Sequence, residues 1–203
     1  MRIGYDAKRA FFNSSGLGNY SRSVISSVSA SFPEHEYLLY TPYPGKAVPF
    51  NGHSNYIIKG PESIVERIVH PYWRSTRLGR YLKKDGVDVY HGLSNELPFN
   101  IVKSGVRSVV TTHDLIFLRY PDFYTAYERF MYGKKFLLAA KNADAVVAIS
   151  EQTKNDLIEY FNIPASKIRV IYQTCNSIFY DRVGDEQKSA VRQKYGLPKD
   201  YIL

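Results

Sequence analysis

The chain has 203 residues, and its 27 lysines and arginines outnumber its 19 aspartates and glutamates, which gives a formal charge of +8. This length is typical of one domain, or of one domain and part of a second. With 44% hydrophobic and 23% charged residues, the chain has enough apolar surface to fold, which excludes a disordered protein. The single cysteine, Cys175, excludes a scaffold of intrachain disulfides.

Neither a membrane-spanning segment nor a signal peptide is expected. The longest apolar runs, Phe136–Ala140 and Ala145–Ile149, are five residues long, whereas a helix needs about twenty apolar residues to cross a bilayer. The first residues, Met1–Lys8, lack the apolar core of a signal peptide. We therefore expect a cytoplasmic protein.

The amino-terminal part of the chain alternates extended and helical patterns. We predict a buried strand at Met1–Ala7, a loop at Lys8–Ser15, and a helix at Leu17–Ser31 whose apolar residues recur at helical spacing. Pro33 ends this helix, and Glu36–Thr41 is predicted as the second strand.

The next segment contains a loop, a short strand and a broken helix. Prolines and glycines predict a loop at Tyr43–Gly52, before a third strand at Tyr56–Lys59. Glu62–Lys84 has a helical pattern, but Pro71 cannot donate a hydrogen bond to the preceding turn. We predict one helix that ends near Val69 and another that begins at Pro71.

The second half of the chain supplies the remaining strands. Val87–His91 and Val106–Thr112 are predicted as the fourth and fifth strands, and the apolar run Ala145–Ile149 as the sixth. A helix is predicted at Phe123–Ala143. Its apolar stripe includes Phe130, Gly133, Leu137 and Ala140.

A last helix and strand complete the pattern. Ser150 is suited to cap a helix that ends near Phe161, and Lys167–Tyr172 is the seventh predicted strand. Because strands and helices alternate, we predict an α/β fold with a parallel sheet of about seven strands and helices on both faces.

The carboxy-terminal tail is predicted to belong to a second domain. Asp185–Tyr195 has the pattern of a short helix closed by Gly196, and Tyr201–Leu203 are three strand formers in a row. A chain that stops within an apparent strand suggests a domain that continues. We therefore expect one domain over residues 1–180 and the first part of another over residues 181–203.

A glycine-containing motif, Gly16-Leu17-Gly18-Asn19-Tyr20, stands at the start of the first long helix. Backbone N–H groups at a helix N-terminus bind phosphate, and glycines let the phosphate come close. Ser21 stands where a dinucleotide fingerprint has its third glycine, which disfavours a nicotinamide oxidoreductase. An ordinary glycine turn into a helix is the alternative.

Two further motifs follow predicted strands, whose carboxyl ends border the ligand crevice of a parallel sheet. Thr111-Thr112-His113-Asp114 would place an imidazole there to orient a hydroxyl or to donate to a developing negative charge, with Asp114 orienting the ring. A loop-capping His–Asp pair is the alternative. The second motif offers polar side chains that suit sugar hydroxyls: His91, Ser94, Asn95 and Glu96. A simple turn at Ser94 and Asn95 is the alternative.

The excess positive charge gathers in the broken helix. Five basic residues of this segment recur at spacings that place them near one face of an α-helix. Such a face would suit an anionic membrane surface, and a solvated helix face is the alternative. Nothing in the sequence resembles a nucleic-acid-binding module. The residues of this basic stripe are Arg67, Arg74, Arg77, Arg80 and Lys84.

No metal site is predicted. His91 and His113 are 22 residues apart, without a third ligand at a characteristic spacing. Cys175 has no neighbouring His or Asp to activate it, so we expect a small buried hydrophobe rather than a nucleophile.

Taken in order, these segments resemble the amino-terminal domain of glycosyltransferase family 4, the retaining nucleotide-sugar enzymes with the two-domain GT-B fold. The resemblance is strongest to members that act in bacterial surface-polysaccharide assembly. The residues that carry it are Met1–Asp6, Gly16–Tyr20, Asp88–Gly92, Val110–Leu115 with Tyr120 and Pro121, Ala143–Ser150, and Pro164–Tyr172.

The resemblance implies a Rossmann-like, doubly wound domain that binds the acceptor, while a carboxy-terminal domain holds most of the nucleotide sugar. It implies that the loop Gly16–Gly18, with Asn19 and Asp114, faces the donor and that His113 is catalytic. The acceptor would meet the polar residues after the fourth strand. No cofactor or metal is implied. In one departure from the family, Gln173-Thr174-Cys175-Asn176 replaces an Asn-Gly turn, and threonine disfavours the positive φ of that glycine.

We therefore expect a retaining hexosyltransferase that moves mannose or glucose from a nucleotide sugar to a lipid-linked or oligosaccharide acceptor at the inner membrane face. Without the carboxy-terminal domain, which by resemblance holds the paired glutamates and the phosphate clamp, the chain is expected to be inactive. The alternatives are a GT-B-fold sugar-nucleotide epimerase and a non-catalytic module that docks on anionic lipid. No nucleic-acid partner is expected.

Overall fold

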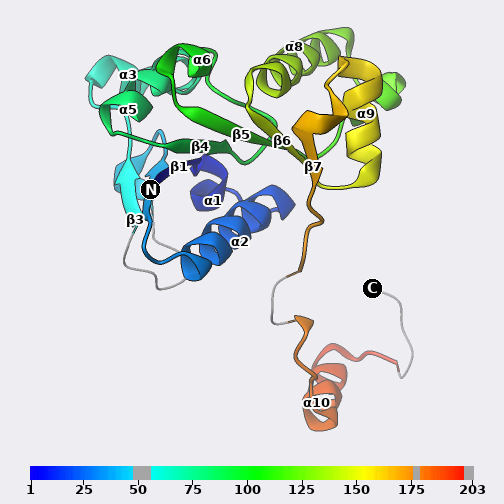
Figure 1. The fold of residues 1–203 in the computed structure, drawn as a ribbon. Coiled ribbons are helices and arrows are strands. Elements are labelled where there is room, and N and C mark those ends of the chain that lie inside the picture. Colours follow the sequence, from blue (N-terminus) through cyan, green and yellow to red (C-terminus); the bar gives the residue numbers. More distant parts are fainter. Residues whose placement is uncertain (48–55, 176–178, 199–203) are drawn as a thin grey trace. The chain divides into compact units, whose positions relative to one another are not determined.

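The computed structural model describes residues 1–47, 56–175 and 179–198. The chain divides into two compact units, Met1–Gln173 and Thr174–Leu203, and each is described by itself. The first unit is built around a seven-stranded sheet in the order β3-β2-β1-β4-β5-β6-β7 (Figure 1). Every neighbouring pair of strands is parallel. This confirms the predicted α/β fold.

Each strand overlaps a predicted one. The order along the sheet reverses between β1 and β4, because β2 and β3 lie on one side of β1 and the later strands lie beyond β4. In an open parallel sheet, ligands bind outside the carboxyl ends of the strands at such a reversal. The strands are β1 (Arg2–Asp6), β2 (Glu36–Tyr40), β3 (Tyr56–Lys59), β4 (Val89–Gly92), β5 (Arg107–Thr112), β6 (Ala145–Ala148) and β7 (Ile168–Val170).

Helices lie on both faces of the sheet. In Figure 1, α1 and α2 lie on one face, and α5, α6 and α8 lie on the other. No helix within the described residues is both long and apolar enough to span a bilayer. The helices of the first unit are α1 (Lys8–Phe12), α2 (Gly16–Ser31), α3 (Ile64–Ile68), α4 (His70–Tyr72), α5 (Leu78–Lys84), α6 (Ile101–Ser104), α7 (Ile116–Arg119), α8 (Ala126–Asn142) and α9 (Glu151–Phe161).

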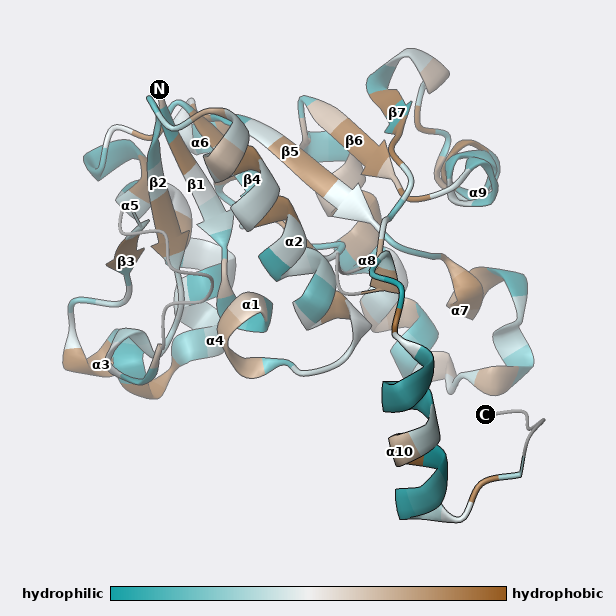
Figure 2. Cartoon of the chain, turned by 90° about the horizontal axis from the view of Figure 1, so that it is seen from below, coloured by the Kyte–Doolittle hydropathy of each residue, from teal (hydrophilic) through white to brown (hydrophobic). Residues whose placement is uncertain are grey.

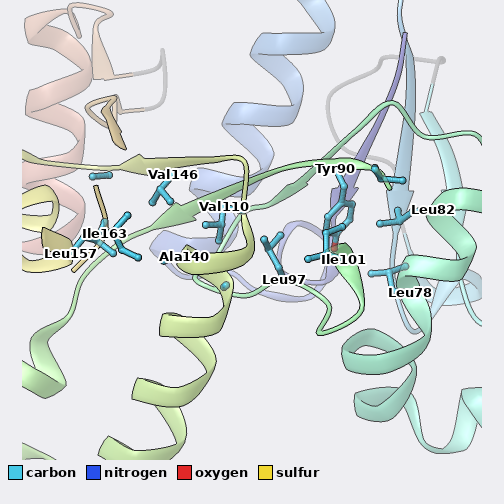
Figure 3. Close-up of a cluster of buried hydrophobic side chains, with 14 of the residues drawn as sticks. Leu78, Leu82, Tyr90, Leu97, Ile101, Val110, Ala140, Val146, Leu157 and Ile163 are labelled. Carbon is cyan, nitrogen blue, oxygen red and sulfur yellow. The ribbon is translucent and has the colours of Figure 1, made fainter. Parts of the chain in front are cut away.

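The alternation of side chains along β2 divides the core in two. Tyr37 and Leu39 pack in a cluster with Ile25 of α2. The intervening Leu38 and Tyr40 pack in the larger cluster on the opposite face, because successive strand residues point to opposite sides. Figure 3 shows part of this larger cluster, in which residues of α5, β4, β5, α8, β6 and α9 meet.

Helix termini follow the residues that predicted them. The Ser150 side chain accepts a hydrogen bond from the Thr153 N–H at 3.1 Å and caps α9, as predicted. In the second unit, α10 (Asp185–Tyr195) ends at Gly196, which has a φ of 62°. That conformation favours glycine, so the predicted helix and its end are confirmed.

Two predictions about local structure in the first unit are wrong, one at Lys8–Ser15 and one at Phe130. The predicted loop at Lys8–Ser15 contains the helix α1, because Arg22 donates to the Ala10 and Asn13 carbonyls at 2.8 and 2.9 Å and holds the segment against α2. Phe130 does not belong to an apolar stripe that faces the core, since it is 63% exposed. Only the carboxyl end of α8 is buried, at Ala139 and Ala140.

The structure also contains elements that were not predicted, namely α6, α7 and a π-helical segment. The helix break near Val69 is confirmed, but the π turn Trp73–Arg77 separates α4 from α5. A π turn holds more residues than an α turn, so it changes which side chains share a face. The predicted strand Tyr201–Leu203 and residues 48–52 of the predicted loop lie outside the described residues.

Candidate functional site

His113 follows β5 at the carboxyl edge of the sheet, and its backbone is fixed on both sides. Its N–H donates to Asn95 Oδ1 at 2.8 Å, and its carbonyl accepts from Thr153 Oγ1 at 3.0 Å. The residue is buried. Asn95 follows β4, Thr153 lies in α9, and His113 itself follows β5. Three parts of the chain therefore fix the position of His113.

Both ring nitrogens of His113 have protein partners. Nε2 lies 2.9 Å from the Leu93 carbonyl oxygen, and Nδ1 lies 3.0 Å from Gln173 Nε2. Burial lowers the pKa of His113, although its hydrogen bond to Leu93 acts in the opposite direction. Asp114 does not orient this ring, which corrects the prediction, because its Oδ1 accepts from the Ile116 N–H at 3.3 Å.

Tyr20 joins the glycine motif to His113. The two rings meet edge to face with centroids 4.8 Å apart. The Tyr20 hydroxyl lies 3.0 Å from Thr111 Oγ1 on β5. Since Tyr20 lies in the second turn of α2, the amino end of α2 and the imidazole share one rim of the sheet. Tyr20 was part of the sequence motif but was not predicted as a site residue.

The two glycines of the motif have different roles. A Cβ at Gly18 would lie 1.8 Å from the Asn13 carbonyl oxygen, so close backbone packing requires glycine here. The Gly18 N–H donates to Asn13 Oδ1 at 3.2 Å and to the Ser15 carbonyl at 3.0 Å. It is therefore unavailable to a phosphate, contrary to the expectation for this residue.

The amides of Gly16 and Leu17 are the donors that remain at this end of α2. Within the described residues neither N–H has an acceptor, as expected for the first turn of a helix. The helix has 16 residues, and its dipole favours an anion at this end. Asn19 points along the helix instead, since its Oδ1 accepts from Arg22 at 2.5 Å.

His91 is wrongly predicted as an acceptor-binding residue. Its Nε2 lies 2.9 Å from Thr111 Oγ1, and its ring packs against Tyr5 at a centroid distance of 5.8 Å. These contacts turn it toward α2, below the rim. Burial, and secondarily the proximity of His113, lower the pKa of His91 to about 4.

The residues that follow His91 form a turn, as one alternative predicted. Asn95 has a φ of 60°, and its N–H donates to the Thr111 carbonyl at 2.8 Å. Asparagine tolerates this left-handed conformation. Ser94 Oγ accepts from Arg9 Nε at 2.8 Å and so links the turn to α1. Ser94 and Asn95 therefore fix the turn that follows β4.

A charge cluster lies beside this turn, where Asp6, Arg74 and Glu96 line a small crevice at the β1–β4 reversal. Arg74 lies 2.5 Å from Asp6 Oδ2 and 3.4 Å from Glu96 Oε2, and Lys135 lies 3.7 Å from Glu96 Oε1. The Asp6 carboxylate is the main cause that raises the pKa of Arg74. Glu96 has the most exposed carboxylate of the cluster, with 34% of its side chain accessible. With Lys135, which is 38% exposed, it is best placed to meet a ligand from solvent.

The basic stripe predicted on the broken helix does not form. Arg74 points into the charge cluster because the π turn rotates it away from the other arginines. Lys84 is paired with Glu62 at 2.7 Å, and Arg77 lies 5.5 Å from the centre of the Tyr72 ring. Arg74 is thus wrongly predicted as membrane-facing, while Arg67 and Arg80 are exposed.

An exposed aliphatic face lies on α3 instead. Ile64, Val65 and Ile68 are 73%, 69% and 75% exposed. Figure 2 shows hydrophobic stretches on this helix. Large aliphatic side chains that are exposed together are a common mark of a contact surface.

No metal centre is present within the described residues, which contain no group of three potential ligands. Cys175 is exposed. The expectation that it would be buried is therefore wrong, because Cys175 lies in the second unit outside the sheet core.

The comparisons with known proteins agree with this fold. The sequence model of Glycosyltransferase Family 4 matches residues 16–176. O-antigen chain mannosyltransferase B of Escherichia coli is 29% identical over 132 residues, which are 64% of this chain and 32% of that protein.

Two solved structures have the same fold at low sequence identity. HepE of Anabaena, solved in complex with UDP, superposes with a TM-score of 0.56 at 13% identity, over 96% of this chain and 49% of HepE. A glycosyltransferase of Rickettsia africae has a TM-score of 0.54 at 14% identity, over 98% of this chain and 50% of that one. The chain thus spans about a third to a half of these relatives.

Proposed function

The chain belongs to Glycosyltransferase Family 4, and on that premise we propose that it forms the acceptor-side domain of a retaining hexosyltransferase. The donor is a nucleoside-diphosphate sugar, with mannose or glucose as the transferred unit. The acceptor is a lipid-linked or free oligosaccharide of a cell-surface polysaccharide. The mannosyltransferase relative and the UDP complex of HepE support this choice.

The observation that carries the proposal is the shared rim of α2 and His113. The amides of Gly16 and Leu17, which have no acceptor among the described residues, suit the oxygens of a diphosphate, because both the N–H groups and the helix dipole favour negative charge. Tyr20 places the His113 ring beside that end of α2. A sugar attached to the diphosphate would therefore reach the imidazole.

The acceptor is proposed to enter over the charge cluster at the β1–β4 reversal. Glu96 lines the small crevice there together with Asp6 and Arg74, and both Glu96 and its partner Lys135 are partly exposed. A carboxylate and an ammonium group are able to accept from and donate to sugar hydroxyls. A lone His113 does not complete a catalytic centre, so a second domain is proposed to supply the remaining groups.

Sugar transfer by the protein that contains both domains tests the proposal. Nucleoside-diphosphate mannose and glucose are supplied with a lipid-linked oligosaccharide, and the anomeric configuration of the product is determined by NMR. We expect transfer with retention, at least a tenfold lower rate for His113→Ala, and no transfer by residues 1–203 alone. Transfer by this chain alone would overturn the two-domain proposal, and a new sugar nucleotide formed without acceptor would favour the epimerase.

A second proposal concerns location. The aliphatic face of α3, flanked by Arg67, suits an anionic bilayer, because apolar side chains enter the acyl boundary while cations remain among the headgroups. This replaces the basic stripe as the membrane-facing surface. A lipid-linked acceptor would then reach the crevice from the membrane surface.

Co-sedimentation with vesicles that contain phosphatidylserine or only phosphatidylcholine tests this location. Ile64→Asp/Ile68→Asp is expected to reduce binding to the anionic vesicles at least fivefold, whereas the matched change Ile57→Asp/Ile116→Asp at other exposed positions leaves it unchanged. Equal binding by both double variants and wild type would contradict a role for α3.

A further inference from the structure

Gln173 is the last residue of the first unit, and its side chain contacts His113. Its Nε2 lies 3.0 Å from His113 Nδ1. Gln173 follows β7 by three positions, and the Ile171 N–H still donates to the Ala148 carbonyl at 3.0 Å. The glutamine is exposed although the imidazole is buried. It thus contacts the imidazole from the position that directly precedes the second unit in sequence.

The hydrogen bonds define the tautomer of His113. A carbonyl oxygen only accepts, so the Nε2 atom that lies 2.9 Å from the Leu93 oxygen carries the proton. In the neutral ring Nδ1 is then an acceptor, and it receives an N–H of the Gln173 carboxamide. Nδ1 is therefore the ring atom left for a substrate hydroxyl, and Gln173 already occupies it.

The other contacts of His113 come from the body of the domain. Leu93 and Asn95 contact its Nε2 and its N–H from the turn after β4, and Thr153 contacts its carbonyl from α9. Gln173 alone among these described partners is exposed and outside any helix or strand. It is the partner that a ligand could displace without disturbing the sheet.

We propose that Gln173 is a positioning residue that occupies Nδ1 of His113 until a hydroxyl of the transferred sugar takes its place. This rests on the proposed function for the identity of the ligand, but not for the contact itself. When the carboxamide leaves Nδ1, the imidazole becomes accessible to the sugar. Gln173 thereby tunes the affinity for the donor.

The contact is tested on the 203-residue chain by ¹⁵N NMR of the histidine ring, with His113→Asn used to assign the signals. We expect Gln173→Ala to move the Nδ1 resonance of His113 and to leave Nε2 unchanged. Gln173→Glu is expected to raise the pKa of His113, because a carboxylate opposite Nδ1 stabilises the imidazolium. Gln187→Ala in α10 is the matched control. An unmoved Nδ1 resonance in Gln173→Ala would overturn the proposal.

Kinetics of the two-domain protein test whether the sugar displaces Gln173 from His113. Release of a competing hydrogen bond is expected to lower KM for the sugar nucleotide about 2- to 10-fold in Gln173→Ala, with a smaller change in kcat, whereas Gln173→Glu raises KM. An unchanged or raised KM in Gln173→Ala would overturn the displacement step. Full activity of His113→Ala would contradict the proposed catalytic role of His113. The NMR experiment would still decide, independently of activity, whether Gln173 hydrogen-bonds to Nδ1.

Discussion

The hydroxyl of Tyr20 lies 3.0 Å from Thr111 Oγ1, and so a side chain of α2 is tied to the middle of the sheet. The same threonine oxygen lies 2.9 Å from His91 Nε2. The Tyr20 hydroxyl, the Thr111 hydroxyl and the His91 ring therefore form a continuous chain of polar contacts. Such a chain stabilises the fold only while every member keeps its partner, because an unpaired buried polar group is costly.

Removal of the Tyr20 hydroxyl should weaken this chain without removing the aromatic contact. Tyr20→Phe keeps the ring against His113 but leaves Thr111 with one partner fewer. We expect a loss of about 1 kcal/mol in the free energy of unfolding, measured with urea. Tyr127→Phe removes an exposed hydroxyl on α8 and should cost much less. Equal losses in the two variants would contradict a specific role for the Tyr20 hydroxyl.

The two glycines of the motif should respond differently to alanine. In Gly18→Ala the new Cβ would lie 1.8 Å from the Asn13 carbonyl, whereas the space around Gly16 is open to 4 Å. Urea unfolding should show a loss of about 3 kcal/mol or more for Gly18→Ala, because backbone must shift. For Gly16→Ala the expected change is within about 0.5 kcal/mol. The reverse order would mean that the turn before α2 is built differently.

Loss of the Arg74 guanidinium should destabilise the protein. Asp6 is only 12% exposed, so Arg74→Met leaves a largely desolvated carboxylate without its cation. We expect a loss of about 2 kcal/mol, below the value for a fully buried pair because Arg74 retains 21% exposure. Asp6→Asn/Arg74→Met should recover part of it. Arg80→Met, at an exposed position, is the control, and a similar loss there would contradict the assignment.

The pKa of His91 predicts an acid-sensitive fold. Its folded pKa of about 4 lies below the ordinary value of 6.5, so the unfolded chain binds a proton more readily. The stabilisation is therefore complete above about pH 6.5 and is lost as the pH falls toward 4, by roughly 3 kcal/mol in total.

Thermal unfolding across this pH range measures the effect. His91→Gln is expected to flatten the decline between pH 6.5 and 4, since glutamine keeps a polar partner for Thr111 but does not titrate there. His35→Gln, at the other end of the strands, should retain the decline. An unchanged slope in His91→Gln would show that other groups cause the acid sensitivity.

The parallel sheet could be predicted because its strands carry local signals. Ala145–Ala148 is apolar throughout, as a strand covered on both faces requires, and Ser150 marks the start of α9. Short helices such as α1 carry weaker signals. The Arg22 hydrogen bonds that hold α1 come from a residue 9–12 positions away, and no local pattern reports them.

The sequence predicted where the candidate site lies, but not which way each of its side chains points or what each one contacts. Order along the chain located His113 at the end of a strand. The directions of side chains depend on contacts between elements, so His91 proved to point below the rim. The π turn at Trp73–Arg77 likewise has no simple sequence signature, and it moved Arg74 from a surface stripe to an ion pair.

The outermost strands of the sheet bear on how the protein behaves at high concentration. β3 has four residues and β7 has three, and each carries one cation, Lys59 or Arg169. Short edge strands offer few open backbone groups to a second molecule, and a charged side chain on such a strand disfavours pairing with another strand. Pairing of two molecules through β3 or β7 is therefore disfavoured, so the backbone hydrogen bonds of the sheet stay within one molecule.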